Sequence, residues 1–151
     1  MGARRDNRGE VTMKPRSART FGYSGTPLID KLGIKPGAKL KFVSEPKGFD
    51  ALLGELPEGS RFAASGSLDF AMLFAKARSD LVKGFARLRD RLEPNGMLWV
   101  AWPKKTSGVE TDLTEGAVRT FGLESGLVDV KVCAIDDTWS GLKFVRRLKD
   151  R

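Results

Sequence analysis

Two short polar segments carry the residue types best suited to binding chemistry. The first runs from Lys104 to Ser107 and offers two ammonium groups and two hydroxyls. We expect a helix soon after it, whose backbone N–H groups and dipole would favour an anion. The second, 136–140, holds two aspartates whose contact with a lysine could restrain it or steer a carboxylate, and an indole that could stack on a planar ligand. The predicted ligand-binding residues are Lys104, Lys105, Ser107, Asp136, Asp137 and Trp139.

Each of these residues also has a purely structural explanation. Paired lysines in loops are usually solvated, and paired aspartates such as Asp136 and Asp137 often serve a hairpin. Trp139 could simply cover the edge of the core. Both interpretations stay open from the sequence, and neither identifies a catalytic residue.

Two absences exclude whole classes of reaction. The chain has no histidine, which excludes imidazole bases, Ser-His-Asp triads and His-ligated metals. Its one cysteine, Cys133, lies in an apolar run expected to be a strand, where a buried and inert thiol is the usual case. We therefore expect no metal site, and any catalysis would need Asp, Glu, Lys, Tyr, Ser, Thr or a borrowed cofactor.

The formal net charge of +8 is concentrated at the N-terminus, because residues 1–20 contain six basic and two acidic side chains. We expect 1–21 to be a disordered basic arm, which could contact nucleic acid or another polyanion weakly or could simply aid solubility. No apolar run is long enough to span a membrane, and no secretory signal precedes the arm. The sequence thus predicts a cytoplasmic protein with no membrane partner and a single α/β domain at 22–151.

The apolar and turn patterns predict alternating strands and helices. Expected strands cover 38–43, 61–64, 68–74, 97–102, 128–135 and 141–147, and expected helices cover 48–55, about 79–92 and 112–123. Thr26 should cap an additional short helix with Pro27 in its first turn, Ser79-Asp80 should cap the helix at 79–92, and Asp112 the one at 112–123. This alternation, closed by a terminal hairpin, predicts a three-layer Rossmann-like sandwich with a mostly parallel sheet and strand order 2-1-3-4-6-5.

The short connection at 65–67 is the weak point of this topology. A helical crossover between parallel strands takes a dozen or more residues. Either an extended loop crosses the sheet there, or 61–64 is an edge strand running in the opposite direction.

The second half, from Leu68-Asp69-Phe70 through Leu92-Glu93-Pro94-Asn95-Gly96-Met97 to the hairpin, resembles the later half of a class I methyltransferase. Three phrases resemble more specifically the bacterial domain-of-unknown-function family 3052: Tyr23 to Leu28, Trp102 to Lys105 and Thr138 to Phe144. The second resemblance covers about 22–148. It implies the methyltransferase-related fold and carries no activity with it.

Two features that bind the cofactor in methyltransferases are missing from this sequence. Methyltransferases resembling this chain place clustered glycines after the first strand, where Ser44-Glu45-Pro46-Lys47-Gly48 stands here. They also place an acidic residue after the second strand, where Phe62-Ala63-Ala64-Ser65 stands. We therefore expect no cofactor, and we favour a non-catalytic binding or regulatory module over a divergent S-adenosylmethionine-dependent transferase or a nucleic-acid-associated protein that uses the basic arm.

Overall fold

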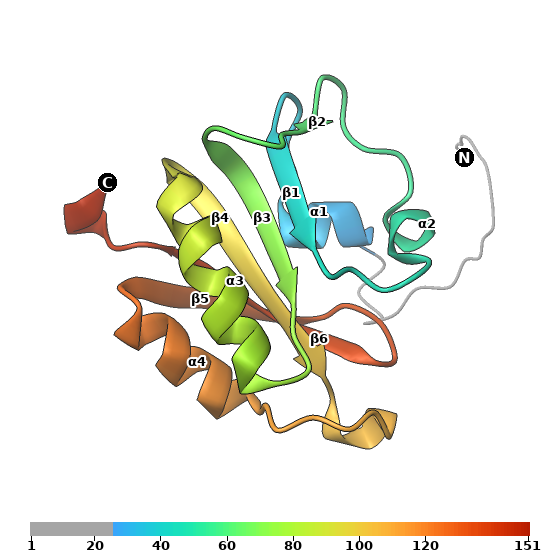
Figure 1. Cartoon of the computed structure of the whole chain (residues 1–151). Helices are drawn as coiled ribbons and strands as arrows, with labels where there is room; N and C mark the ends of the chain where they lie inside the picture. Colours follow the sequence, from blue (N-terminus) through green and yellow to red (C-terminus); the bar gives the residue numbers. More distant parts are fainter. Residues whose placement is uncertain (1–25) are drawn as a thin grey trace.

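The computed structural model describes residues 26–151, so the expected basic arm at 1–21 lies outside the described residues. One six-stranded sheet runs through the molecule in the order β2-β1-β3-β4-β6-β5 (Figure 1). The strands are β1 Lys39–Val43, β2 Arg61–Phe62, β3 Leu68–Phe74, β4 Leu92–Pro103, β5 Leu127–Ala134 and β6 Trp139–Arg146. The α-helices are α1 Leu28–Leu32, α2 Phe49–Leu53, α3 Arg78–Arg91 and α4 Glu115–Glu124, with short 3-10 turns at Lys105–Ser107 and Leu148–Asp150.

This topology confirms the predicted strand order. Strands β2, β1, β3 and β4 run parallel to one another, whereas β6 pairs antiparallel with both β4 and β5. The hairpin β5–β6 thus closes a mostly parallel sheet. Because β4 runs parallel to β3 and antiparallel to β6, the end of β4 and the start of β6 lie at the same edge.

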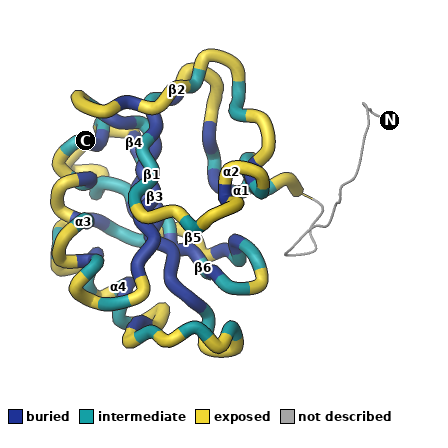
Figure 2. The backbone as a smooth tube through the Cα atoms, turned by 45° about the vertical axis from the view of Figure 1, so that its right-hand side comes forward, coloured by how far each residue is buried: buried dark blue, intermediate teal, exposed yellow. Residues whose placement is uncertain are grey.

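Two hydrophobic cores sandwich the sheet, one on each face. Helices α3 and α4 cover one face and α1 and α2 lie on the other (Figure 1). Side chains of β3 alternate between the cores, with Leu73 on the α3 side and Met72 and Phe74 on the α1 side. The strands between the helical layers are accordingly the most deeply buried part of the backbone (Figure 2). This arrangement confirms the three-layer prediction.

The short link between β2 and β3 is an extended loop, and β2 runs parallel to β1. Strand β2 has only two residues, which pair with Lys39 and Leu40 at the beginning of β1. The loop therefore only has to pass the amino end of β1, and five residues suffice where a full crossover would need a helix. Arg91 holds this loop by donating to the carbonyls of Ala63 and Gly66 at 3.0 and 2.6 Å.

Several local predictions are wrong at helix boundaries. Pro27, not Thr26, occupies the cap position of α1. Ala77 occupies the cap position of α3, and Asp80 in the first turn of that helix accepts from the backbone N–H groups of Lys76 and Ala77. Thr114 caps α4 through the Ala117 N–H, because Asp112 instead accepts from the N–H of Arg78. Side chains that compete for the same orphan N–H groups cannot be ranked from sequence spacing alone.

Strand β4 is longer than predicted because it includes Pro94, Asn95 and Gly96, which were expected to form a turn. The register between β3 and β4 shifts there, since Leu68 pairs with Leu92 and Phe70 with Met97. This irregularity accommodates a proline in the strand. No helix in the described part of the chain is long and apolar enough to span a membrane.

Candidate functional site

The loop after β4 and the β5–β6 hairpin lie side by side, as the pairing of β4 with β6 requires. Pro103 is the register partner of Trp139, and the backbone N–H of Lys104 donates to the carbonyl of Thr138 at 2.8 Å. Both segments lie at the carboxyl edge of the parallel strands, where open α/β sheets place their ligands.

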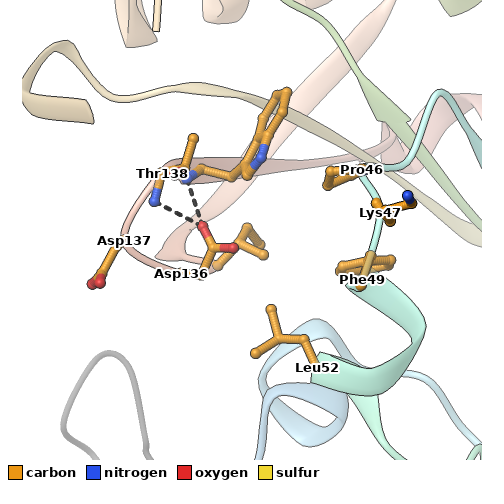
Figure 3. Close-up of a pocket in the computed structure, with 10 residues that line it drawn as sticks. Pro46, Lys47, Phe49, Leu52, Asp136, Asp137 and Thr138 are labelled. Atoms are coloured by element: carbon orange, nitrogen blue, oxygen red, sulfur yellow. Dashed lines mark hydrogen bonds between the residues drawn. The ribbon is translucent and has the colours of Figure 1, made fainter. Parts of the chain in front are cut away.

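A pocket of about 440 Å³ opens at this edge on the α1 and α2 side of the sheet (Figure 3). One wall is the turn after β1 together with the first residues of α2, and the other wall is the hairpin (Figure 3). Its volume lies within the range of ordinary small-molecule sites. The lining residues are Pro46, Lys47, Gly48, Phe49, Leu52, Ile135, Asp136, Asp137, Thr138 and Trp139.

A row of aromatic rings supports the pocket from below. The Phe49 ring lies 4.9 Å from that of Phe74, and the Phe74 ring lies 5.1 Å from that of Trp139, both edge to face. Phe49, Phe74 and Trp139 are all buried in the same core. Edge-to-face rings of this kind stabilise one another beyond their buried area, so the base of the pocket is a fixed apolar surface.

The polar groups of the pocket stand on opposite walls. Asp136 uses its Oδ1 to accept from the N–H groups of Thr138 and Trp139, both at 2.8 Å (Figure 3). This carboxylate thus shapes the hairpin, and its second oxygen is available to a ligand. Lys47 lies across the pocket and makes no side-chain hydrogen bond or ion pair to any described residue, and Asp137 points away from the turn (Figure 3).

Of the predicted ligand-binding residues, the structure brings Asp136, Asp137 and Trp139 to this pocket. Lys104, Lys105 and Ser107 are not among its lining residues. The Ser107 hydroxyl donates to the carbonyl of Lys104 at 2.7 Å and accepts from the Val109 N–H at 3.1 Å, so it serves its own turn.

The helix expected at 112–123 is present as α4, but Lys104 to Ser107 do not lie directly before its first turn. A 3-10 turn occupies Lys105–Ser107, and α4 begins only at Glu115. Intervening residues are tied to the loop after β3, since the Thr111 hydroxyl donates to the Lys76 carbonyl at 2.6 Å. The helix dipole therefore adds no positive potential beside the two lysines, because it acts only within the first turn.

Sequence reasoning missed the opposite wall, which the turn after β1 forms. Ser44 is the only described residue other than glycine with a positive φ, at 62°, and Gly48 follows at 89°. The left-handed geometry that clustered glycines usually supply is thus present, with a serine in one of the positions. Lys47 and Phe49 could have been singled out by their place directly after the first buried strand.

The second strand cannot supply a ribose-binding carboxylate in this structure. Strand β2 ends at Phe62, level with Leu40 near the start of β1. It therefore stops well short of the carboxyl edge that β1 reaches at Val43. No residue of β2 therefore reaches the place where an acidic side chain could bind a ribose.

Other chemistry is limited in the described residues. No cluster of acidic residues and Cys133 within 26–151 is arranged to hold a metal ion. Cys133 is buried, and burial raises the pKa of its thiol above the ordinary value despite the nearby charges of Lys31 and Lys131. A thiol held in its neutral form is a poor nucleophile.

No model of a known protein family matches the sequence, and no curated protein matches it. Solved structures do match the fold. A S-adenosylmethionine-dependent methyltransferase from Aquifex aeolicus is 12% identical with a TM-score of 0.58, over 78% of this chain and 86% of that one. A TehB-like methyltransferase from Corynebacterium glutamicum is 12% identical with a TM-score of 0.51, over 80% of this chain and 85% of that one.

A third similar structure was solved with a ligand bound. Magnesium protoporphyrin IX methyltransferase from Synechocystis PCC 6803, in complex with S-adenosylhomocysteine, is 11% identical with a TM-score of 0.52. The match covers 80% of this chain and 78% of that one. At such low identity the likeness concerns the fold alone. This chain therefore has the Rossmann-like fold of S-adenosylmethionine-dependent methyltransferases.

Proposed function

We propose that this chain is a small-molecule-binding module built on a methyltransferase scaffold, with its ligand in the pocket between the β1–α2 turn and the β5–β6 hairpin. The observation that carries the proposal is the position of that 440 Å³ pocket, at the carboxyl edge of the sheet and over a fixed aromatic base.

The lining chemistry favours an amphipathic zwitterion. Phe49 and Trp139 are 2% and 7% exposed, so they offer the pocket a narrow apolar surface against which a small apolar group can pack. Lys47 on one wall suits a carboxylate or phosphate, and the Asp136 carboxylate on the other suits an ammonium group. A ligand with both charges and an apolar body would contact all three surfaces.

The composition of the pocket supports a binding role without covalent catalysis. Its titratable groups are Lys47, Asp136 and Asp137, and Asp136 is engaged in shaping the hairpin. No residue of the pocket combines a nucleophile with a hydrogen-bonded base, which is the arrangement that covalent catalysis needs.

A divergent S-adenosylmethionine-dependent transferase is the second candidate, and the fold of the similar structures favours it. The backbone after β1 also keeps left-handed residues at Ser44 and Gly48, as a cofactor-binding turn does. Two features weigh against the usual binding pose of the cofactor. The turn with Glu45 and Pro46 prevents a close approach of the backbone to the cofactor, and the short β2 provides no carboxylate for the ribose.

Titration calorimetry on the full chain separates the two candidates. S-adenosylmethionine and S-adenosylhomocysteine should bind with Kd values of about 1 mM or weaker. Micromolar binding of either compound would replace the module with the transferase.

A matched pair of lysine variants tests the location of the site. L-Phenylalanine serves as a zwitterionic aromatic probe, and calorimetry measures its binding. Lys47→Ala should weaken its binding severalfold, whereas Lys104→Ala, at the same sheet edge but outside the pocket, should leave it within about twofold. If only Lys104→Ala weakens binding, the ligand lies at the β4 loop and the proposed pocket is wrong.

A further inference from the structure

Four lysines gather on the α1 side of the sheet, outside the lining of the pocket. Lys131 of β5 and Lys143 of β6 are direct register partners in the antiparallel hairpin. Lys31 lies in α1 and Lys35 follows that helix. None of the four lines the pocket described above.

Hydrogen bonds to backbone carbonyls hold two of these lysines in place. Lys131 donates from Nζ to the carbonyl of Lys31 at 2.9 Å, and Lys31 donates from Nζ to the carbonyl of Ala134 at 3.5 Å. These contacts join α1 to β5. Neutral carbonyl oxygens satisfy donors but do not neutralise the ammonium charges.

The charges of this lysine cluster are uncompensated. Within residues 26–151, none of Lys31, Lys35, Lys131 and Lys143 forms an ion pair with a carboxylate. Lys143 is half-buried, and burial lowers the pKa of its ammonium group, with the charges of Lys131 and Lys35 lowering it further. Like charges directly opposite one another across a strand pair destabilise a sheet.

Solvation explains one exposed lysine but not this arrangement. The half-buried amine of Lys143, with the charges of Lys131 and Lys35 nearby, costs folding free energy at neutral pH, and a bound anion would offset that cost. Sites that are unfavourable in the free protein and favourable with a ligand are typical of binding function.

We propose that Lys31, Lys35, Lys131 and Lys143 form a binding site for a compact, multiply charged phosphate group, independent of the pocket at the carboxyl edge. Lysine acts on phosphate as a point charge and needs no planar geometry, so several converging ammonium groups suit a small polyanion. The phosphate could belong to a free phosphorylated compound or to the backbone of a nucleic acid.

The test compares two double variants that remove the same charge. Lys35→Gln/Lys143→Gln changes two cluster residues that form no side-chain hydrogen bond to described residues. Lys83→Gln/Arg87→Gln is the control, because both side chains are exposed on α3, which covers the opposite face of the sheet. Both variants keep residues 1–25, so any binding by the N-terminal charges is the same in each.

Inorganic triphosphate is the probe, titrated by calorimetry at low ionic strength, where charge interactions are least screened. We expect the cluster variant to bind it about tenfold or more weakly than wild type, and the control to stay within about twofold. Equal binding of triphosphate by both variants would overturn the proposal. The proposal would also fail if the wild-type protein bound neither triphosphate nor a single-stranded oligonucleotide.

Two further measurements complete the test. Competition with a single-stranded oligonucleotide distinguishes the source: displacement of triphosphate from the cluster indicates a nucleic-acid phosphate, and its absence indicates a free compound. Without ligand, the cluster variant should melt at a higher temperature than wild type, because it loses a half-buried charge among like charges. A lower melting temperature would make the lysines structural and contradict the proposal.

Discussion

The rings of Phe74 and Trp139 meet edge to face, with their centroids 5.1 Å apart and their planes at 86°. They belong to β3 and β6, which are separated in the sheet by β4. Ala101 of β4, the register partner of Phe74, is small enough for the two rings to meet above it. Trp139 is 7% exposed, so its main contribution is to the core and only its rim is open to a ligand.

Replacing Trp139 by alanine should therefore destabilise the fold. Removing a buried indole from a packed core costs about 3–5 kcal/mol, and Trp139→Phe should cost much less because it keeps an aromatic contact with Phe74. Urea denaturation followed by circular dichroism measures both. An alanine variant as stable as wild type would show that the indole is free to serve a ligand instead.

The regular part of the fold was predictable because each element repeats a simple pattern. Strand β3 is apolar at nearly every position, which indicates burial on both faces, and the structure places it between the two cores. The hairpin required only two apolar runs and a polar turn. From these elements the order of all six strands follows, since right-handed crossovers leave few arrangements.

The site was predictable only in part, because its two walls are far apart in the sequence. Adjacency of the loop after Pro103 to the hairpin follows from strand pairing, and the structure has it. The position of Leu52 opposite Asp136 depends instead on how α2, a five-residue helix, packs in the tertiary structure. No local sequence pattern encodes that packing. Lys104 and Lys105 were favoured for their charge, whereas the chain's direction after Pro103 takes them outside the pocket.

Ser44 should be a strained position whose replacement by glycine stabilises the protein. Its φ of 62° costs a side chain roughly 1–2 kcal/mol, a cost that glycine does not have. After the greater flexibility of glycine in the unfolded chain is subtracted, Ser44→Gly should gain about 0.5–1 kcal/mol. Ser44→Val should lose stability, because a β-branched residue tolerates positive φ poorly.

Ser65 provides the matched control for this series. It is an exposed loop serine without a positive φ, so Ser65→Gly should be neutral or slightly destabilising. Thermal melts of the four proteins, including wild type, should rank Gly above Ser above Val at position 44. The reverse ranking would mean that the turn after β1 does not hold its left-handed geometry in solution.

The Glu93 carboxylate links three segments at the amino edge of the sheet, and its contribution to stability should depend on pH. Glu93 accepts hydrogen bonds from Lys39 Nζ at 2.8 Å and from the Ser67 hydroxyl at 2.6 Å, and thus ties β1, the β2–β3 loop and β4 together. The hydrogen bond from Lys39 lowers the pKa of Glu93 below its ordinary value, and the bond from Ser67 and the charge of Lys39 lower it further.

Because the folded-state pKa lies below the unfolded one, the ionised carboxylate stabilises the fold above the unfolded value of 4.5. That stabilisation should disappear as the pH falls through the folded-state pKa. Glu93→Gln should therefore melt below wild type at pH 7, and the difference in melting temperature should narrow steadily as the pH falls below about 5. Asp90→Asn, which removes an exposed ion pair with Arg89 at the end of the same helix, should change stability little at any pH. A difference for Glu93→Gln that stays constant as the pH falls would show that the carboxylate acts through its shape and not through its charge.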